Sequence, residues 1–126
     1  MVIVPLHAGG LWLGVDASCV VEVLPRREAA ALVGASALVR GIIPWRSRAI
    51  AVVDPGAWAG STCNGSPDYR RLLVVAWDDF VIALGADAVR EAQQGEVDGE
   101  YADCGGARLK MLALDELGRL LVALPS

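Results

Sequence analysis

The side chains that could carry out chemistry are few and lie far apart in the sequence. His7 is the only histidine, and no Gly-x-Ser-x-Gly motif accompanies it, so the chain lacks the pattern of a Ser-His-Asp hydrolase. Neither a Walker loop nor a Gly-x-Gly-x-x-Gly motif is present, which argues against a nucleotide site. A single histidine near the N-terminus is also a poor phosphotransfer group, because that role needs a histidine exposed on a helix.

The acidic pairs have simpler structural interpretations. Asp78-Asp79 separates two apolar runs and is predicted to form the tip of a hairpin, where solvated acids are common. Asp115-Glu116 is interpreted as a helix cap, and Asp87 lies where a strand is expected to turn. None of these acids has the nearby oxygen ligands that calcium or acid–base catalysis requires. We therefore predict no enzyme activity, no metal site and no cofactor.

The three cysteines, Cys19, Cys63 and Cys104, are odd in number and widely spaced. No Cys-x-x-Cys pair exists, so zinc binding and dithiol redox chemistry are not indicated. Cys19 lies in an apolar run and is predicted to be a small core residue. Cys63 and Cys104 fall in segments rich in Gly and Ser, where we expect free thiols in loops. A small enzyme that uses Cys63 or Cys104 stays open as an alternative.

The overall composition indicates one folded domain that spans residues 1–126. Hydrophobic residues make up 55% of the chain and the mean hydropathy is +0.47, values that disordered chains do not reach. The net charge is −4, and ten arginines accompany a single lysine without forming a basic stripe, so nucleic-acid binding is not indicated. No apolar run is long enough to span a bilayer, and the N-terminus lacks the features of a secretory signal. A cytoplasmic protein is expected.

Short apolar runs bounded by turn residues predict a mostly β structure. The predicted strands are Leu11–Val15, Cys19–Leu24, Ile50–Asp54, Leu72–Trp77, Val81–Ala86 and Leu109–Leu114. Residues 60–67 and 95–106 are interpreted as glycine-rich connectors, and the alanine-rich residues 26–38 as a place for one or two helical turns.

Two segments show the same local design, in which a strand ends in an aspartate and a short helix follows. Asp54 precedes Pro55. An aspartate at this place can accept hydrogen bonds from the free amides of the first helical turn. Proline fits the first helical position, because the backbone N–H that it lacks would have no partner within the helix. Asp115 follows the second such strand. The design predicts two similarly built halves.

Segments in the same order and spacing resemble the CheW-like domain, which is found in the chemotaxis adaptor CheW and in the regulatory domain of the kinase CheA. Val20–Leu24 is similar to the family's strand V-x-E-V/I. Residues 41–54 resemble the signature G-V-I-N-L-R-G-x-x-I-P-V-x-D. Residues 83–89 and 112–115 are similar to its V-D-x-V and L-D elements.

Three residues depart from the family signature around Arg46. Pro44 replaces an asparagine, Ser47 replaces a glycine and Ala51 replaces a proline. Pro44 removes a backbone donor, and Ser47 would be strained if its position requires a positive φ. We therefore expect the turn at Arg46 to differ in shape from the family norm, and the chain to be a divergent member.

The resemblance implies an all-β fold of two small SH3-like five-stranded β-barrels packed side by side. It also implies a non-catalytic adaptor that bridges the cytoplasmic tip of a chemoreceptor and a CheA-type histidine kinase. The partner-binding surface of the family corresponds to Val20, Glu22, Gly41 and Arg46 in this chain. Arg46 would pair with a receptor glutamate, and Val20 would make an apolar contact beside it. Gly41 would permit close approach of the backbone. Trp45 is expected to turn inward or onto the Arg46 guanidinium.

Two further alternatives remain beside the small enzyme mentioned above. The chain could be a CheW-like scaffold of a non-flagellar pathway, such as pilus or gliding motility, that binds only one of these partners. Arg46 could instead be a surface residue that covers the barrel seam.

Overall fold

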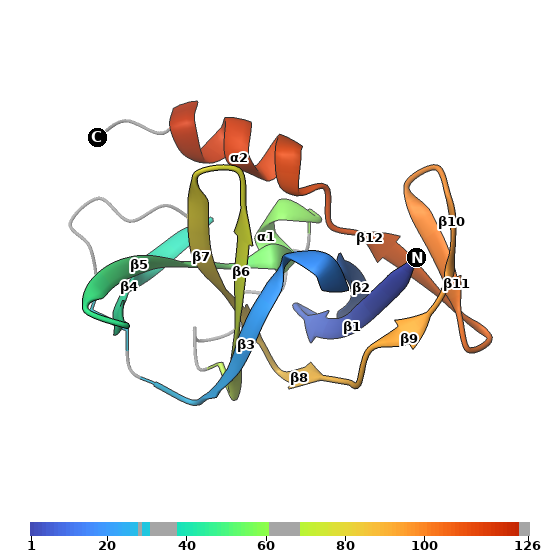
Figure 1. Ribbon diagram of the computed structural model, residues 1–126, viewed down its shortest axis with the longest axis horizontal. Helices are drawn as coiled ribbons and strands as arrows, with labels where there is room; N and C mark the ends of the chain where they lie inside the picture. Colours follow the sequence, from blue (N-terminus) through green and yellow to red (C-terminus); the bar gives the residue numbers. More distant parts are fainter. Residues whose placement is uncertain (28, 31–37, 61–68, 124–126) are drawn as a thin grey trace.

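Two β-sheets form most of the computed structural model, which describes residues 1–27, 29–30, 38–60 and 69–123 (Figure 1). One sheet has five strands in the order β3-β6-β7-β5-β4. The other has seven, in the order β10-β11-β12-β2-β1-β8, with β9 also paired to β1. The prediction of a mostly β fold with two small sheet units is confirmed. One unit has the expected five strands, and very short strands enlarge the other.

The middle of the chain supplies the five-stranded sheet, and the two ends supply the seven-stranded sheet. The first consists of β3 (Val20–Pro25), β4 (Val39–Trp45), β5 (Arg48–Val53), β6 (Arg71–Trp77) and β7 (Phe80–Ala86). The second consists of β1 (Val2–Ala8), β2 (Leu11–Asp16), β8 (Ala88–Val89), β9 (Gln93–Gln94), β10 (Glu96–Asp98), β11 (Tyr101–Cys104) and β12 (Ala107–Met111). Between and after the strands lie the 3-10 helix η1 (Ala17–Cys19), α1 (Pro55–Trp58) and α2 (Leu114–Ala123).

Alternating side chains of the interior strand β6 explain how the two units join. Leu72 and Val74 point into a core cluster within the five-stranded unit. Leu73 and Val75 point the other way, into a cluster shared with β1, β2 and the helix residue Leu117. Successive residues of a strand face opposite sides of a sheet, so a continuous apolar run is expected where both faces are buried. Each such side chain contributes roughly 1.5–3 kcal/mol by leaving water.

The predicted hairpin at Trp77–Phe80 is confirmed. Trp77 pairs with Phe80 across the antiparallel strands β6 and β7, and Asp78 has a φ of 48°. The predicted Asp54 cap is also confirmed, because its Oδ1 accepts hydrogen bonds from the amides of Gly56 at 2.9 Å and Ala57 at 3.3 Å.

The second predicted cap was wrong. Helix α2 begins at Leu114, so Asp115 lies inside its first turn, where a carboxylate interacts with the positive end of the helix dipole. The preceding strand also ends earlier than predicted, at Met111, because the chain leaves the sheet before entering the helix.

The predicted connector at residues 95–106 was wrong, because it contains the paired strands β10 and β11. Cys104 therefore lies in a strand and is buried, not in a loop. Its thiol donates to Gln93 Oε1 at 3.5 Å and faces the Gln94 carbonyl oxygen at 3.8 Å. Cys19 is half-buried against the core, as expected for a small apolar side chain. Cys63 lies outside the described residues.

Most of the alanine-rich segment predicted to hold helical turns lies outside the described residues as well. Of the part that is described, Ala30 forms a β-bridge with Ile42, with backbone hydrogen bonds of 2.8 and 3.0 Å. No helix within the described ranges is long and apolar enough to cross a membrane.

Candidate partner-binding surface

The two edge strands of the five-stranded sheet, β3 and β4, are joined by side chains. The Trp45 indole Nε1 donates a hydrogen bond of 2.6 Å to Glu22 Oε1. Arg27 Nη1 donates to the Pro44 carbonyl oxygen at 3.1 Å. Because β3 and β4 stand at opposite ends of the strand order, these bonds close the sheet into a barrel-like unit. Glu22 and Trp45 therefore mark the seam of this unit.

Arg46 and Ser47 form a two-residue turn between β4 and β5. Trp45 pairs with Arg48, and the two turn residues have φ values of 45° and 65°. A tight turn of this length requires positive φ to match the twist of its strands, and glycine or asparagine normally supplies it. The predicted strain at Ser47 is thus present, because this position does take a positive φ.

The turn carries the Arg46 guanidinium back over the seam. Its Cζ lies 4.6 Å from the centroid of the Trp45 ring, and Nη2 lies 3.5 Å from Glu22 Oε1. Trp45 is only 9% exposed, so its ring turns inward and also underlies the guanidinium. The Glu22 carboxylate consequently receives both the indole N–H and the arginine charge. We call Glu22, Trp45 and Arg46 the seam cluster.

Exposure separates the roles within the seam cluster. The Arg46 side chain is 61% exposed, whereas the Glu22 side chain is 36% exposed. An ion pair this close to water adds little to stability, so the pair does not explain why the arginine is there. The planar guanidinium keeps donors free of Glu22, and it can bind a second carboxylate in a bidentate arrangement.

The four sequence-predicted site residues do not all meet. Glu22 and Arg46 come together, as described. Val20 begins β3, pairs with Val75 and packs against the shared core while staying half-buried. Gly41 is buried, and a Cβ there would lie 2.6 Å from the Ala30 carbonyl oxygen, so the close approach it permits is by the chain itself.

Sequence reasoning missed two features of this surface. One is the bond between Trp45 and Glu22, which joins residues 23 positions apart and leaves no local pattern. The other is the pair Val21 and Val23, which stay exposed on β3. In the sequence, Val21 and Val23 alternate with Glu22 and Leu24. This alternation indicates a strand whose exposed face carries apolar side chains, as an edge strand can.

The described residues show no arrangement typical of catalysis. In this part of the chain, no group of three or more His, Cys, Asp or Glu side chains is placed to hold a metal ion. His7 Nδ1 lies 3.4 Å from Asp87 Oδ2, and its ring contacts Trp12. Burial, and then the negative charge of Asp54, raise the pKa of Tyr69 above its usual range, so its hydroxyl stays protonated rather than acting as a base.

Comparison with known proteins shows the family and the fold of the chain. The family model described as the CheW-like domain matches residues 3–99, and the chain belongs to this family. A search of curated protein sequences found no match. Among solved structures, the chain is similar to the scaffolding protein TtCheW from Thermoanaerobacter tengcongensis, with a TM-score of 0.75 and 20% sequence identity. That match covers 89% of this chain and 88% of the other, and it confirms the CheW-like fold.

Proposed function

We propose that the chain is a non-catalytic cytoplasmic adaptor that couples chemoreceptors to a CheA-type histidine kinase. One surface binds the cytoplasmic tip of a receptor and another binds the regulatory domain of the kinase, in arrays beneath the inner membrane. The observation that carries this proposal is the seam cluster in a member of the CheW-like family. It holds an exposed arginine over a buried ring.

The seam cluster has the properties of a pre-organised binding group. Stacking on Trp45 restricts the Arg46 side chain before a partner arrives, which lowers the entropic cost of binding. When Arg46 turns toward a partner carboxylate, Glu22 still accepts the indole hydrogen bond. Binding therefore leaves the Glu22 carboxylate with a hydrogen-bond donor, and a receptor glutamate can replace Glu22 as the partner of the guanidinium.

The other two proposed site residues act differently from each other. Val20 is half-buried beside Glu22 on β3 and offers an apolar contact at the edge of the cluster. Gly41 acts through the backbone, because its lack of a Cβ lets Ala30 pair with β4 and fixes the strand that carries Trp45. We therefore expect a side chain at Gly41 to disturb the surface without touching the partner.

Isothermal titration calorimetry tests the proposal. The partners are a cytoplasmic fragment of a receptor and the regulatory domain of a CheA-type kinase, both from the same organism. Arg46→Glu should weaken receptor binding about 30-fold, which corresponds to about 2 kcal/mol for a reversed charge at an interface centre. Arg71→Glu is the matched control, because Arg71 is exposed in the same sheet and its guanidinium donates a hydrogen bond of 2.9 Å to the neighbouring Arg70 carbonyl oxygen. It should change the affinity less than about twofold.

The alternatives give different results in the same experiment. If Arg46→Glu unfolds the domain, the arginine is structural and covers the seam. If the affinity for both partners is unchanged, the seam cluster is not the binding surface. Binding of only one of the two partners by the wild-type chain would indicate the single-partner scaffold of a non-flagellar pathway.

A further inference from the structure

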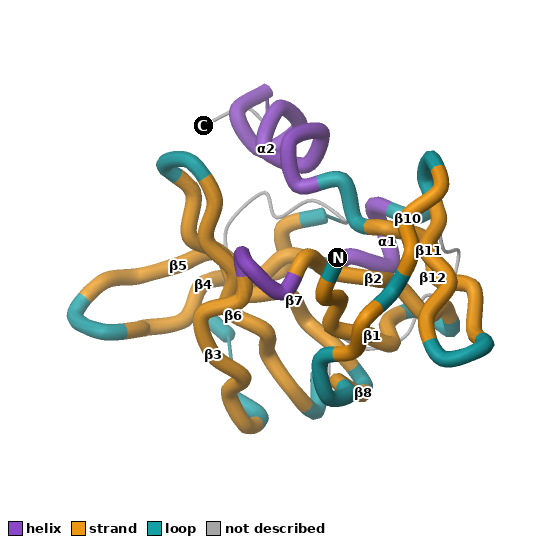
Figure 2. The backbone as a smooth tube through the Cα atoms, turned by 45° about the vertical axis from the view of Figure 1, so that its right-hand side comes forward, coloured by secondary structure: helices purple, strands orange, loops and turns teal. Residues whose placement is uncertain are grey.

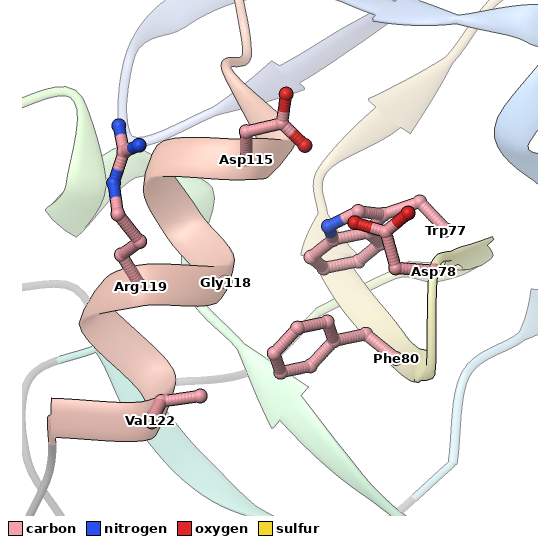
Figure 3. A pocket seen from close by; sticks show the side chains of 7 residues that line it. All are labelled: Trp77, Asp78, Phe80, Asp115, Gly118, Arg119 and Val122. Carbon is pink, nitrogen blue, oxygen red and sulfur yellow. The ribbon is translucent and has the colours of Figure 1, made fainter.

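A groove of about 480 Å³ lies between the β6–β7 turn and helix α2 (Figure 3). Trp77, Asp78 and Phe80 form one wall, and Asp115, Gly118 and Val122 form the other. Figure 1 shows the turn of β6 and β7 beside α2, whereas the β4–β5 turn extends away from the helix. The groove shares no residue with the seam cluster and needs a separate explanation.

The wall that carries Trp77 and Phe80 is aromatic, and its rings are held in place. The Trp77 and Phe80 rings stack with centroids 5.0 Å apart and planes 18° from parallel. Helix α2 meets them at Gly118, where a Cβ would lie 3.0 Å from the Phe80 ring. A side chain at Gly118 would therefore crowd the Phe80 ring and require the ring or the helix to shift. The helix and the aromatic pair therefore form a preformed surface.

The charges at this groove are mainly negative. Asp78 and Asp115 stand on opposite walls, and both carboxylates lie on the same side of α2 as the aromatic rings in Figure 3. Arg119 is the one basic lining residue, and its side chain extends along the side of the helix away from the rings. Among the described residues, neither aspartate forms an ion pair with it. Asp79 and Glu116, which are exposed neighbours, add further negative charge.

An exposed apolar side chain completes the groove. Val122 lines the groove from α2 and is 74% exposed. A ligand that suits this lining must bring apolar groups for Val122 and the rings together with positive charge for the two carboxylates. An arginine side chain does both, because its alkyl stem lies on apolar surface while its guanidinium binds acids.

We propose that this groove docks an arginine-bearing segment of a protein partner, with the arginine between Asp78 and Asp115 and an adjacent aliphatic residue on Val122. The negative charge disfavours an anionic membrane surface and nucleic acid as occupants. The site would give the adaptor a contact that shares no residue with the seam cluster.

The probe is the blocked peptide acetyl-Leu-Leu-Arg-Leu-amide, titrated into the isotopically labelled full chain by NMR. We expect it to shift the Trp77 indole and the Gly118 amide signals, while the same peptide with Glu in place of Arg does not. Asp78→Asn and Asp115→Asn should each weaken binding about threefold to tenfold, since each removes one charged acceptor. Asp78→Asn keeps the backbone of the turn, because asparagine tolerates a positive φ.

Matched controls come from neighbouring acids that do not line the groove. Asp79→Asn and Glu116→Gln should leave the peptide affinity within about twofold, and so should Arg46→Glu in the seam cluster. The proposal is overturned if the Glu peptide shifts the same signals equally or if the Arg peptide shifts neither. Equal weakening by the control variants would also overturn it. Sedimentation of the free chain adds a further test: self-association that Asp78→Asn and Asp115→Asn abolish would make a second copy the occupant.

Discussion

The two hairpin turns of the five-stranded sheet have the same length and opposite charge. Each is a two-residue turn that follows a tryptophan, Trp45 in one and Trp77 in the other, and each places a non-glycine residue at positive φ. Because β5 and β7 run parallel, the two turns lie at the same end of the sheet. One turn carries Arg46 and the other carries Asp78 and Asp79. Surfaces of opposite sign at one end of a sheet suit different partners.

The anchoring of the two tryptophans differs, and this difference shows what each turn depends on. Trp45 is buried and bonded to Glu22 across the seam, so the basic turn is tied to the core of its own unit. Trp77 is half-buried and stacks on Phe80, and both rings contact α2 at Gly118. Figure 2 shows α2 outside both sheets. The acidic turn therefore depends on this helix. A perturbation of α2 should therefore affect the acidic turn and spare the basic one.

The largest expected effect is on stability. Trp45→Ala should lower the free energy of unfolding by about 3–5 kcal/mol, because it empties a core site and removes the donor to Glu22. Trp77→Ala should cost less, since its ring is only half-buried. Denaturant unfolding of both variants measures the difference, and an equal loss would contradict the contrast between the two anchors.

Next in size is the effect on binding. Reversing the acidic turn with Asp78→Lys should leave receptor affinity within about twofold, although Arg46→Glu lowers it about 30-fold. Titration calorimetry on the two variants in one buffer makes the comparison. A comparable loss for both would mean that the turns form one continuous binding surface.

Backbone strain should give a smaller effect, and in the opposite direction. Ser47→Gly should raise the free energy of unfolding by about 1 kcal/mol, because the left-handed region is unfavourable for residues with a Cβ. Asp78→Gly should raise the free energy of unfolding by less, since aspartate adopts the left-handed conformation more readily than serine. Thermal unfolding detects both changes. A destabilised Ser47→Gly variant would show that the serine side chain contributes more than its backbone costs.

The smallest effect concerns the ion pair in the seam cluster. A double-mutant cycle of Glu22→Gln and Arg46→Gln should give a coupling of at most about 0.5 kcal/mol that declines in salt, because the pair is exposed. Glutamine at position 22 keeps a carbonyl oxygen for the Trp45 indole. A coupling above about 1.5 kcal/mol would assign Arg46 a structural role instead.

Long apolar strands with clear turn residues were predictable from the sequence, and the less regular strands were not. The hairpin at Trp77–Phe80 and the Asp54 cap depend on neighbouring residues, so local patterns were sufficient. Strand β1 was missed because Pro5 and His7 interrupt its apolar pattern, although it forms a local hairpin with β2 in which Pro5 pairs with Gly14. Strands β10 and β11 were missed because glycines and acids dominate residues 95–106, and only their pairing makes them strands.

The candidate surface was predictable only in part, for a related reason. The family signature pointed to Glu22 and Arg46, and the structure places them 3.5 Å apart. No local rule predicts that Trp45 bonds Glu22, because that contact depends on closure of the sheet. The resemblance also pointed to Gly41 as a place of close backbone approach, and in the structure Ala29 and Ala30 lie against it, which no local pattern predicts.

The most direct test of the central claim is whether both partners bind at once. Light scattering coupled to size-exclusion chromatography measures the mass of the chain mixed with the kinase regulatory domain and the receptor fragment. The account predicts a ternary complex that the wild-type chain forms and Arg71→Glu retains, whereas Arg46→Glu yields only the binary complex with the kinase domain. Mutually exclusive binding of the two partners to the wild-type chain would contradict the bridging role.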